Sequence, residues 1–200
     1  MSFTTAAQSA FAARFDAAGK PLWLLPIGDV DNDNSTADAR AIALDANGNA
    51  FVGGCFGGSF ELGDDHVGSI DFRDGYVAKL SPAGSPVWLT TLPGACVNAI
   101  AVDAAGHARV GGHYTGSPDF GTGPLPFNGL AAAFVAALDA AGKPIETRVF
   151  GVVGAVSSVS GIAAVDGGIL VAGKFDGVLD ITPHPLQSAG GTNLFVARLR

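Results

Sequence analysis

The chain has 200 residues, of which 48% are hydrophobic and only 14% charged, and its formal net charge is −7. Its 11 lysines and arginines are scattered, which argues against nucleic-acid binding because neutralising phosphates requires clustered basic side chains. No apolar run approaches the roughly 20 residues of a membrane-spanning helix, so we expect no membrane insertion. The first residues also lack the pattern of a signal peptide, since Arg14 and Asp16 interrupt the apolar stretch.

Short apolar runs follow one another along the chain, bounded by Gly, Pro, Asn or Asp. This pattern is typical of β-strands rather than helices. The first two strands are expected at 11–15 and about 21–27, and the next four at roughly 39–45, 50–56, 75–81 and 86–92.

The same runs then return in the same order, so that one unit of about 60 residues is repeated along the chain. Ile42, Ile100 and Ile162 occupy one position of the repeat, at spacings of 58 and 62 residues. The matching segments are 41–54, 99–112 and 161–173 for one half of the unit, and 11–19, 76–84, 134–142 and 195–200 for the other. Aromatic residues recur at one position, and we expect all of them in the core because a periodic apolar position is usually buried: Phe11, Tyr76, Phe134 and Phe195.

Most of the predicted hairpins turn at an Asp-x-x-Gly motif. The Asp side chain is suited to accept hydrogen bonds from turn amides, and the Gly supplies a positive φ. These features predict a type I turn followed by a glycine bulge after Asp16, Asp45, Asp103 and Asp139.

Four-stranded antiparallel units of this length predict an all-β fold of the β-propeller type, within a single domain over 1–200. The units are a partial blade at 11–28, blades at 39–92 and 97–150, and a partial blade at 157–200. About three blades form an incomplete ring, which should leave open sheet edges and an uncovered apolar face. Three interpretations follow: the chain belongs to a longer array, its copies complete a ring as a homo-oligomer, or the architecture is an open, non-propeller one.

Several motifs together resemble a known repeat family. They are Ala-Ile-Ala-Val-Asp-Ala-x-Gly, Val-Gly-Gly-x-Phe/Tyr-x-Gly, an acidic–apolar pair, and Phe-Val-Ala-Lys/Arg-Leu-Asp-x-x-Gly followed by Trp. Over about residues 10–200 this combination resembles the bacterial SBBP-type β-propeller repeats. The resemblance implies an exported or cell-surface bacterial protein built from tandem blades without a catalytic activity of its own. The chain departs from the pattern at Glu146, where other copies have Trp23 and Trp88, and in a shortened turn at 166–168.

The chain has two cysteines, Cys55 at the end of one second strand and Cys96 just before the next first strand. Packed side by side, consecutive blades would bring both to one rim, where an oxidising compartment would let them form a disulfide. The alternative is two buried thiols.

One acidic loop has alternating carboxylates, a spacing that suits a hard cation such as calcium. The predicted ligands are Asp29, Asp31, Asp33 and Asp38. Asn34 and Arg40 break the EF-hand pattern, so a solvated acidic loop is the alternative. No other cofactor is expected.

The remaining polar residues do not form a recognisable site. The histidines His66, His107, His113 and His184 occupy different repeat positions and have no ligand-spaced partner. The recurring acids Glu61, Asp119 and Asp180 suit a role in a turn or at a strand end. We therefore expect a non-catalytic binding or scaffold module with a protein or glycan ligand. The alternatives are a hydrolase or lyase with its site in the propeller channel, and a purely structural spacer.

Overall fold

The computed structural model describes residues 8–29, 31–32, 34–70, 73–126, 130–151, 154–181 and 185–200. Within these ranges the chain forms strands and turns and contains no helix, so the predicted all-β class is confirmed. The described residues accordingly include no helix of the length and apolarity that crossing a membrane requires.

Four main antiparallel sheets follow one another along the chain. The N-terminal sheet pairs β1 (Ala10–Phe15) with β2 (Pro21–Ile27). The first full sheet has the order β3 (Thr36–Leu44), β4 (Ala50–Gly57), β7 (Asp74–Leu80) and β8 (Pro86–Leu92). The second full sheet consists of β9 (Ala95–Val102), β10 (Ala108–Tyr114), β11 (Ala132–Leu138) and β12 (Pro144–Phe150). The C-terminal sheet has three strands, β13 (Val156–Val165), β14 (Gly168–Asp176) and β17 (Asn193–Leu199).

Two small hairpins extend from the ends of the larger sheets. One pairs β5 (Ser59–Leu62) with β6 (Asp65–Gly68), and the other pairs β15 (Val178–Leu179) with β16 (Leu186–Gln187). Both lie between the second and third strands of their unit.

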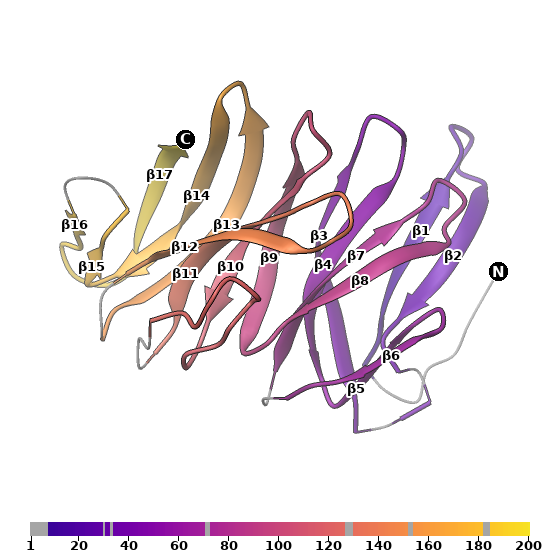
Figure 1. Ribbon diagram of the computed structural model, residues 1–200, viewed down its shortest axis with the longest axis horizontal. Coiled ribbons are helices and arrows are strands. Elements are labelled where there is room, and N and C mark those ends of the chain that lie inside the picture. The colour runs from indigo at the N-terminus through magenta and orange to yellow at the C-terminus, as the bar shows by residue number, and fades with distance from the viewer. Residues whose placement is uncertain are drawn as a thin grey trace.

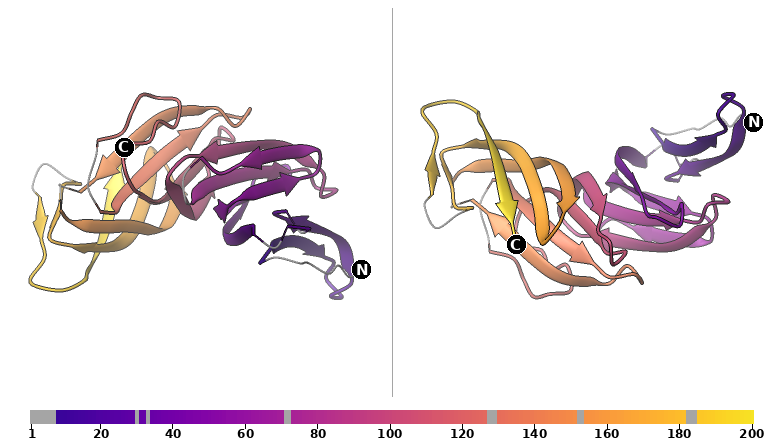
Figure 2. Two further views of the ribbon diagram at one scale, coloured as in Figure 1. Left: turned by 90° about the horizontal axis from the view of Figure 1, so that it is seen from below. Right: turned by 90° about the horizontal axis from the view of Figure 1, so that it is seen from above.

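The four main sheets stand side by side in chain order, with their faces turned toward one another (Figure 1). The strand β9 packs against both β3 and β13, so the first strands of the three larger sheets are neighbours. The N-terminal and C-terminal sheets lie at opposite ends of this row and are well separated (Figure 2). We call the contact between the two full sheets the first junction, and the contact between the second full sheet and the C-terminal sheet the second junction.

The predicted turn chemistry is present. After β3, Gly48 has a φ of +79° and its amide donates to the Asp45 carbonyl at 3.0 Å. The Asp45 carboxylate accepts hydrogen bonds from the amides of Asn47 and Asn49, each at 2.9 Å. The same bonds recur at Asp16, Asp103 and Asp139. A local four-residue signal therefore fixes each of these four hairpins.

Tryptophans join the outer strands of the first two sheets to the next sheet. Trp23 on β2 lies against Gly84 and donates its indole N–H to the Pro82 carbonyl at 3.1 Å. Trp88 on β8 contacts Gly142 in the same way and donates to the Ala140 carbonyl at 3.1 Å. In both cases the indole covers the outer hairpin turn of the following sheet. The C-terminal sheet has no fourth strand among the described residues, and so no such turn.

The Glu146 substitution has a local explanation. It stands on β12 where the earlier sheets have Trp, and its carboxylate pairs with Arg148 at 2.6 Å and lies 3.9 Å from Arg109. With no outer turn to cover in the described part of the C-terminal sheet, a charged side chain is accommodated there.

The core fills the spaces between the sheets in three clusters. Tyr76, Phe134 and Phe195 are buried in them, as predicted. Phe11 is 59% exposed, so the prediction that places it in the core is wrong. Its neighbours Ala10 and Ala12, on the other side of β1, are the ones that pack against the first full sheet.

Candidate functional site

The first strand of each larger sheet contains one extra residue that has no partner on the second strand. In β3 this residue is Arg40, between the pairs Ala39–Gly54 and Ala41–Gly53. The same register shift leaves out Asn98 in β9 and Ser160 in β13. These are three equivalent β-bulges, and such a bulge redirects the side chain of the inserted residue.

The paired glycines on the second strands make room for these bulges. A Cβ on Gly54 would lie 1.9 Å from the Asp38 carbonyl oxygen, and one on Gly112 would lie 1.8 Å from the Cys96 carbonyl oxygen. The preceding glycine, Gly53, instead leaves space for the neighbouring sheet, because a Cβ on it would lie 2.8 Å from the Ile100 Cδ1 atom of that sheet. The Val-Gly-Gly motif therefore has two separate structural causes.

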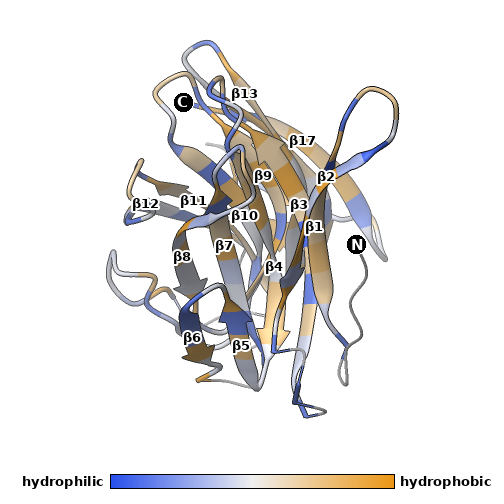
Figure 3. Cartoon of the chain, turned by 90° about the vertical axis from the view of Figure 1, so that its right-hand side faces the viewer, coloured by the Kyte–Doolittle hydropathy of each residue, from blue (hydrophilic) through white to orange (hydrophobic). Residues whose placement is uncertain are grey.

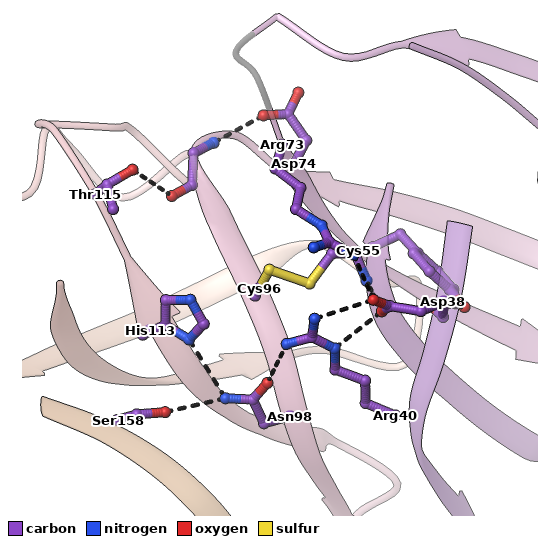
Figure 4. The surroundings of a disulfide bond; sticks show 12 residues. Asp38, Arg40, Cys55, Arg73, Asp74, Cys96, Asn98, His113, Thr115 and Ser158 are labelled. Atoms are coloured by element: carbon purple, nitrogen blue, oxygen red, sulfur yellow. Dashed lines mark hydrogen bonds and ion pairs between the residues drawn. A yellow bond between two sulfur atoms is a disulfide. The ribbon is translucent and has the colours of Figure 1, made fainter. Parts of the chain in front are cut away.

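The bulged residues form a hydrogen-bonded chain from sheet to sheet (Figure 4). Arg40 is held by Asp38, with Nε–Oδ1 and NH2–Oδ2 distances of 3.0 and 2.9 Å, and donates from NH1 to Asn98 Oδ1 at 2.9 Å. Asn98 Nδ2 donates in turn to Ser158 Oγ at 3.0 Å and to the Val159 carbonyl at 3.2 Å. Both junctions are thus crossed by a polar contact from a bulged residue.

A disulfide connects the two sheets of the first junction beside these hydrogen bonds (Figure 4). Cys55 on β4 and Cys96 on β9 are bonded at an S–S distance of 2.06 Å, with their Cα atoms 5.0 Å apart. Of the two interpretations of the cysteines, the structure contains the disulfide and not the free thiols.

The positions of the two cysteines are repeat positions, and other copies fill them differently. Cys55 corresponds to His113 on β10 and Lys174 on β14; the first two follow a glycine pair, and Lys174 follows Ala172-Gly173. Cys96 corresponds to Ser158 on β13. At the second junction, therefore, His113 and Ser158 occupy the places that the disulfide occupies at the first.

A cleft of about 400 Å³ opens at this place in the second junction. Its polar lining side chains are Arg40, Asn98, His113, Ser157, Ser158, Ser160 and Lys174. The lining contains two permanent positive charges and no carboxylate. This is unusual for a chain in which acidic residues outnumber basic ones by 18 to 11.

The imidazole of His113 lies within this cationic surrounding. Burial lowers its pKa, and the positive charges of Arg40, Lys174 and Arg73 lower it further. The Asn98 amide lies 3.4 Å from His113 Nδ1, a long contact that leaves the ring weakly held. At neutral pH His113 is therefore uncharged.

The residues of the predicted calcium site face different neighbours. Asp29 accepts hydrogen bonds from Ser59 Oγ and from the Asp31 amide, and the bond from Ser59 lowers the pKa of Asp29. Asp38 instead binds the guanidinium groups of Arg40 and Arg73. Asp33 lies outside the described residues.

Over the described ranges, no group of three or more His, Cys, Asp or Glu side chains is placed to hold a metal ion. The calcium site stays a prediction, which a melting curve with millimolar calcium or a chelator would test.

The other candidate residues have structural partners. His66 pairs with Glu61 at 2.9 Å across β5 and β6, and His107 lies 3.2 Å from the Asp103 carboxylate. Asp119 accepts amide hydrogen bonds from Gly121 and Gly123, the turn role predicted for it. His184 lies outside the described residues.

Sequence reasoning missed the cleft because its residues come from different copies of the repeat. A signal for it was present in the alignment of the copies. Directly after the glycine that faces the bulge, Cys55, His113 and Lys174 share one position, and two residues before each bulge Asp38, Cys96 and Ser158 share another. Where a repeat keeps its backbone motif and varies its polar side chains, the variable positions mark a candidate site.

Comparison with known proteins gives the fold little further support. No protein-family model and no curated protein matches the chain. A solved structure described as a protein of unknown function from Bacteroides caccae aligns with it at 11% identity and a TM-score of 0.45. The alignment covers 92% of this chain and 59% of the solved one, so the chain spans less than two thirds of that protein's length.

Proposed function

We propose that the chain is a non-catalytic scaffold and binding module made of β-propeller-type blades, each main sheet being one complete or partial blade. The blades extend by stacking further sheets at the two ends of the row, from other copies or from a longer array. The polar cleft at the second junction is the place of recognition.

The observation that carries the scaffold role is the contrast between equivalent residues inside the row and at its ends. Val77 and Val135 are buried in the junctions, whereas their counterpart Val196 on β17 is 76% exposed. Ile100 is 7% exposed, whereas its counterpart Ile42 on β3 is 62% exposed. Apolar residues whose counterparts are buried between sheets indicate a surface suited to another sheet.

Both ends of the row carry such a surface. The N-terminal end face consists of Phe11, Phe15, Ile42 and Leu44, and the C-terminal end face of Leu170, Leu194 and Val196. Figure 3 looks onto the N-terminal end, where β1 and β3 include apolar residues. Single exposed apolar residues are common on proteins, but two groups at opposite ends favour end-to-end contact.

The disulfide and the motifs support an exported location. A disulfide persists in an oxidising compartment and is rare in the cytosol. The resemblance of the repeats to the bacterial SBBP-type family implies the same location, at the cell surface or outside the cell.

A binding role accounts for the second junction better than a uniform spacer does. Identical spacer blades would repeat their polar side chains, yet here the equivalent positions are a disulfide in one junction and an open cleft in the other. An enzymatic role has less support, because Ser157 Oγ is occupied by the Ala133 amide and the Phe150 carbonyl. His113, kept uncharged, has no carboxylate beside it in the cleft lining to orient its ring.

Native mass in solution tests the scaffold role. Sedimentation velocity over a tenfold concentration range should give species larger than one chain, growing with concentration. Val196→Asp places a charge on the C-terminal end face and should return the chain to a monomer. Val87→Asp is the matched control, since Val87 on β8 is also exposed but lies away from both end faces.

A well-folded monomer at every concentration would overturn the proposal that other copies of the chain supply the further sheets. Equal loss of association in the two variants would overturn it too, because the contact would then not involve the end face.

A further inference from the structure

We propose that the cleft at the second junction binds an oxyanion, the phosphate, sulfate or carboxylate group of a small ligand. The proposal names the ligand class for the binding role given above and rests on that role. Three features of the cleft lead to it: its charge, its free donors, and its position in the repeat.

The charge of the cleft favours an anion. Arg40 and Lys174 contribute permanent positive charge, and Arg73 lies near enough to act on His113. The carboxylate near these groups, Asp38, binds Arg40 and Arg73 but does not line the cleft. The cleft lining itself has two cations and no carboxylate, an excess of positive charge that an anion would balance.

The cleft also has donors to offer. Within the described part of the chain, neither Lys174 Nζ nor Ser160 Oγ has a hydrogen-bond or ion-pair partner. Lys174 is exposed, so its ammonium is free to reach a ligand. Hydroxyl and ammonium donors around fixed positive charge are the groups that hold oxyanions in proteins, with charge-assisted hydrogen bonds.

The scaffold places these groups around the cleft. Lys174 pairs with Ser158 across β13 and β14, and Ser160 is the bulged residue of β13. The Arg40 side chain is fixed from the other side by the two hydrogen bonds to Asp38 and the one to Asn98. A ligand would therefore meet an Arg40 guanidinium that is already oriented, which lowers the entropy cost of binding.

The repeat explains why this site exists at one junction only. At the first junction the disulfide fills the place that corresponds to His113 and Ser158. At the second junction the corresponding residues are polar, and both line the cleft.

The test is a titration of the whole chain with inorganic phosphate, sulfate and malonate by calorimetry, with sodium chloride at matched ionic strength as the reference. The His113 ring is followed by NMR in the same samples, because an anion in the cleft offsets the surrounding cations and raises the His113 pKa. We expect saturable binding and a His113 response that chloride does not reproduce. Binding of phosphate and sulfate without malonate would assign the site to tetrahedral oxyanions, and binding of malonate as well would extend it to carboxylates.

Two variants locate the site. Lys174→Gln should weaken binding about tenfold, the size of one charge-assisted hydrogen bond. Lys143→Gln, an equally exposed lysine on the outer turn between β11 and β12, should leave it unchanged. Both residues are exposed, so both variants should fold.

The proposal is wrong if no probe binds, if chloride gives the same response, or if the two variants weaken binding equally. Native mass is measured in the same samples. Retained end-to-end association with no anion binding would refute the oxyanion site alone, and loss of association would bear on the scaffold role instead.

Discussion

The two junctions of this molecule have the same backbone and different chemistry. In each, a bulged residue on the first strand reaches the next sheet, and a glycine admits an Ile from that sheet: Ile100 against Gly53 and Ile162 against Gly111. The first junction adds a covalent bond, while the second adds a cleft lined by cations and hydroxyls.

The comparison separates what stacking requires from what it leaves free. Stacking requires the glycine pair, the bulge and the apolar contact, since these recur at both junctions. It leaves free the residue after the glycine pair and the residue two before the bulge, which vary from copy to copy. A protein with this backbone can therefore carry a disulfide at one junction and a cleft at another without a change of fold.

The largest effect is expected from removing the disulfide. The double variant Cys55→Ala, Cys96→Ala should lose about 4 kcal/mol of unfolding free energy, the chain-entropy value for a bond between residues 41 apart. Urea unfolding of the variant and of the reduced wild-type chain measures this loss. If both remained as stable as the oxidised wild type, the first junction would not depend on its covalent bond.

The next effect concerns the apolar contact that both junctions share. Ile100→Ala should cost about 3 kcal/mol, because Ile100 is buried against Gly53 and the substitution leaves a cavity. Ile162→Ala should cost less, since Ile162 is only partly buried. Ile42→Ala, at the same repeat position on the exposed end face, should change stability by less than about 0.5 kcal/mol.

Denaturant unfolding of the three variants under one set of conditions gives the ranking. Equal costs at Ile42 and Ile100 in a monomeric sample would mean that the end face is covered, contrary to the open row described above.

A third prediction converts the second junction into the first. The double variant His113→Cys, Ser158→Cys places cysteines at the positions that correspond to Cys55 and Cys96. If the junctions are equivalent, a second disulfide should form and raise the unfolding free energy by about 2 kcal/mol, at the low end of the usual range because Asn98 loses its Ser158 partner. A thiol assay under denaturing conditions tests for the bond, and two free thiols per chain would refute the equivalence.

The smallest effect is a pH dependence at the second junction. The pKa of folded His113 is lowered by burial and by Arg40, Lys174 and Arg73, whereas in the unfolded chain it is near 6.5. As the pH falls through 6.5 the unfolded chain gains a proton that folded His113 does not, so stability should decrease. Above that pH, His113 is neutral in both states and contributes no slope.

His113→Gln should remove this part of the decrease. Between pH 5 and 7, the slope of unfolding free energy against pH should become smaller by an amount that corresponds to less than one proton. Unfolding curves of the two chains across this range provide the measurement. Parallel curves would indicate that His113 titrates normally in the folded chain.

Some of the fold could be predicted from the sequence because its causes are local. The turn after Asp45 is specified by an Asp that accepts amide hydrogen bonds and a Gly with positive φ three residues later. The strands of the first full sheet were predicted within a few residues of their observed ends. The repeat then applies the same local information to the other copies.

Burial was predictable only where a neighbouring sheet exists. Phe11 and Tyr76 occupy the same repeat position, but of these two residues only Tyr76 is buried. Periodicity identifies the apolar side of a strand, but what covers that side depends on the position of the copy in the row.

The sequence alone thus determined the class of fold, the hairpins and the length of the repeat, since strand pattern and turn chemistry act over a few residues. Only the tertiary structure decided that Cys55 binds Cys96, that Arg40 reaches Asn98 58 positions away, and that His113 faces a cleft instead of a partner thiol. These contacts join residues from different copies of the repeat. They depend on how each sheet packs against the next, which no local pattern specifies.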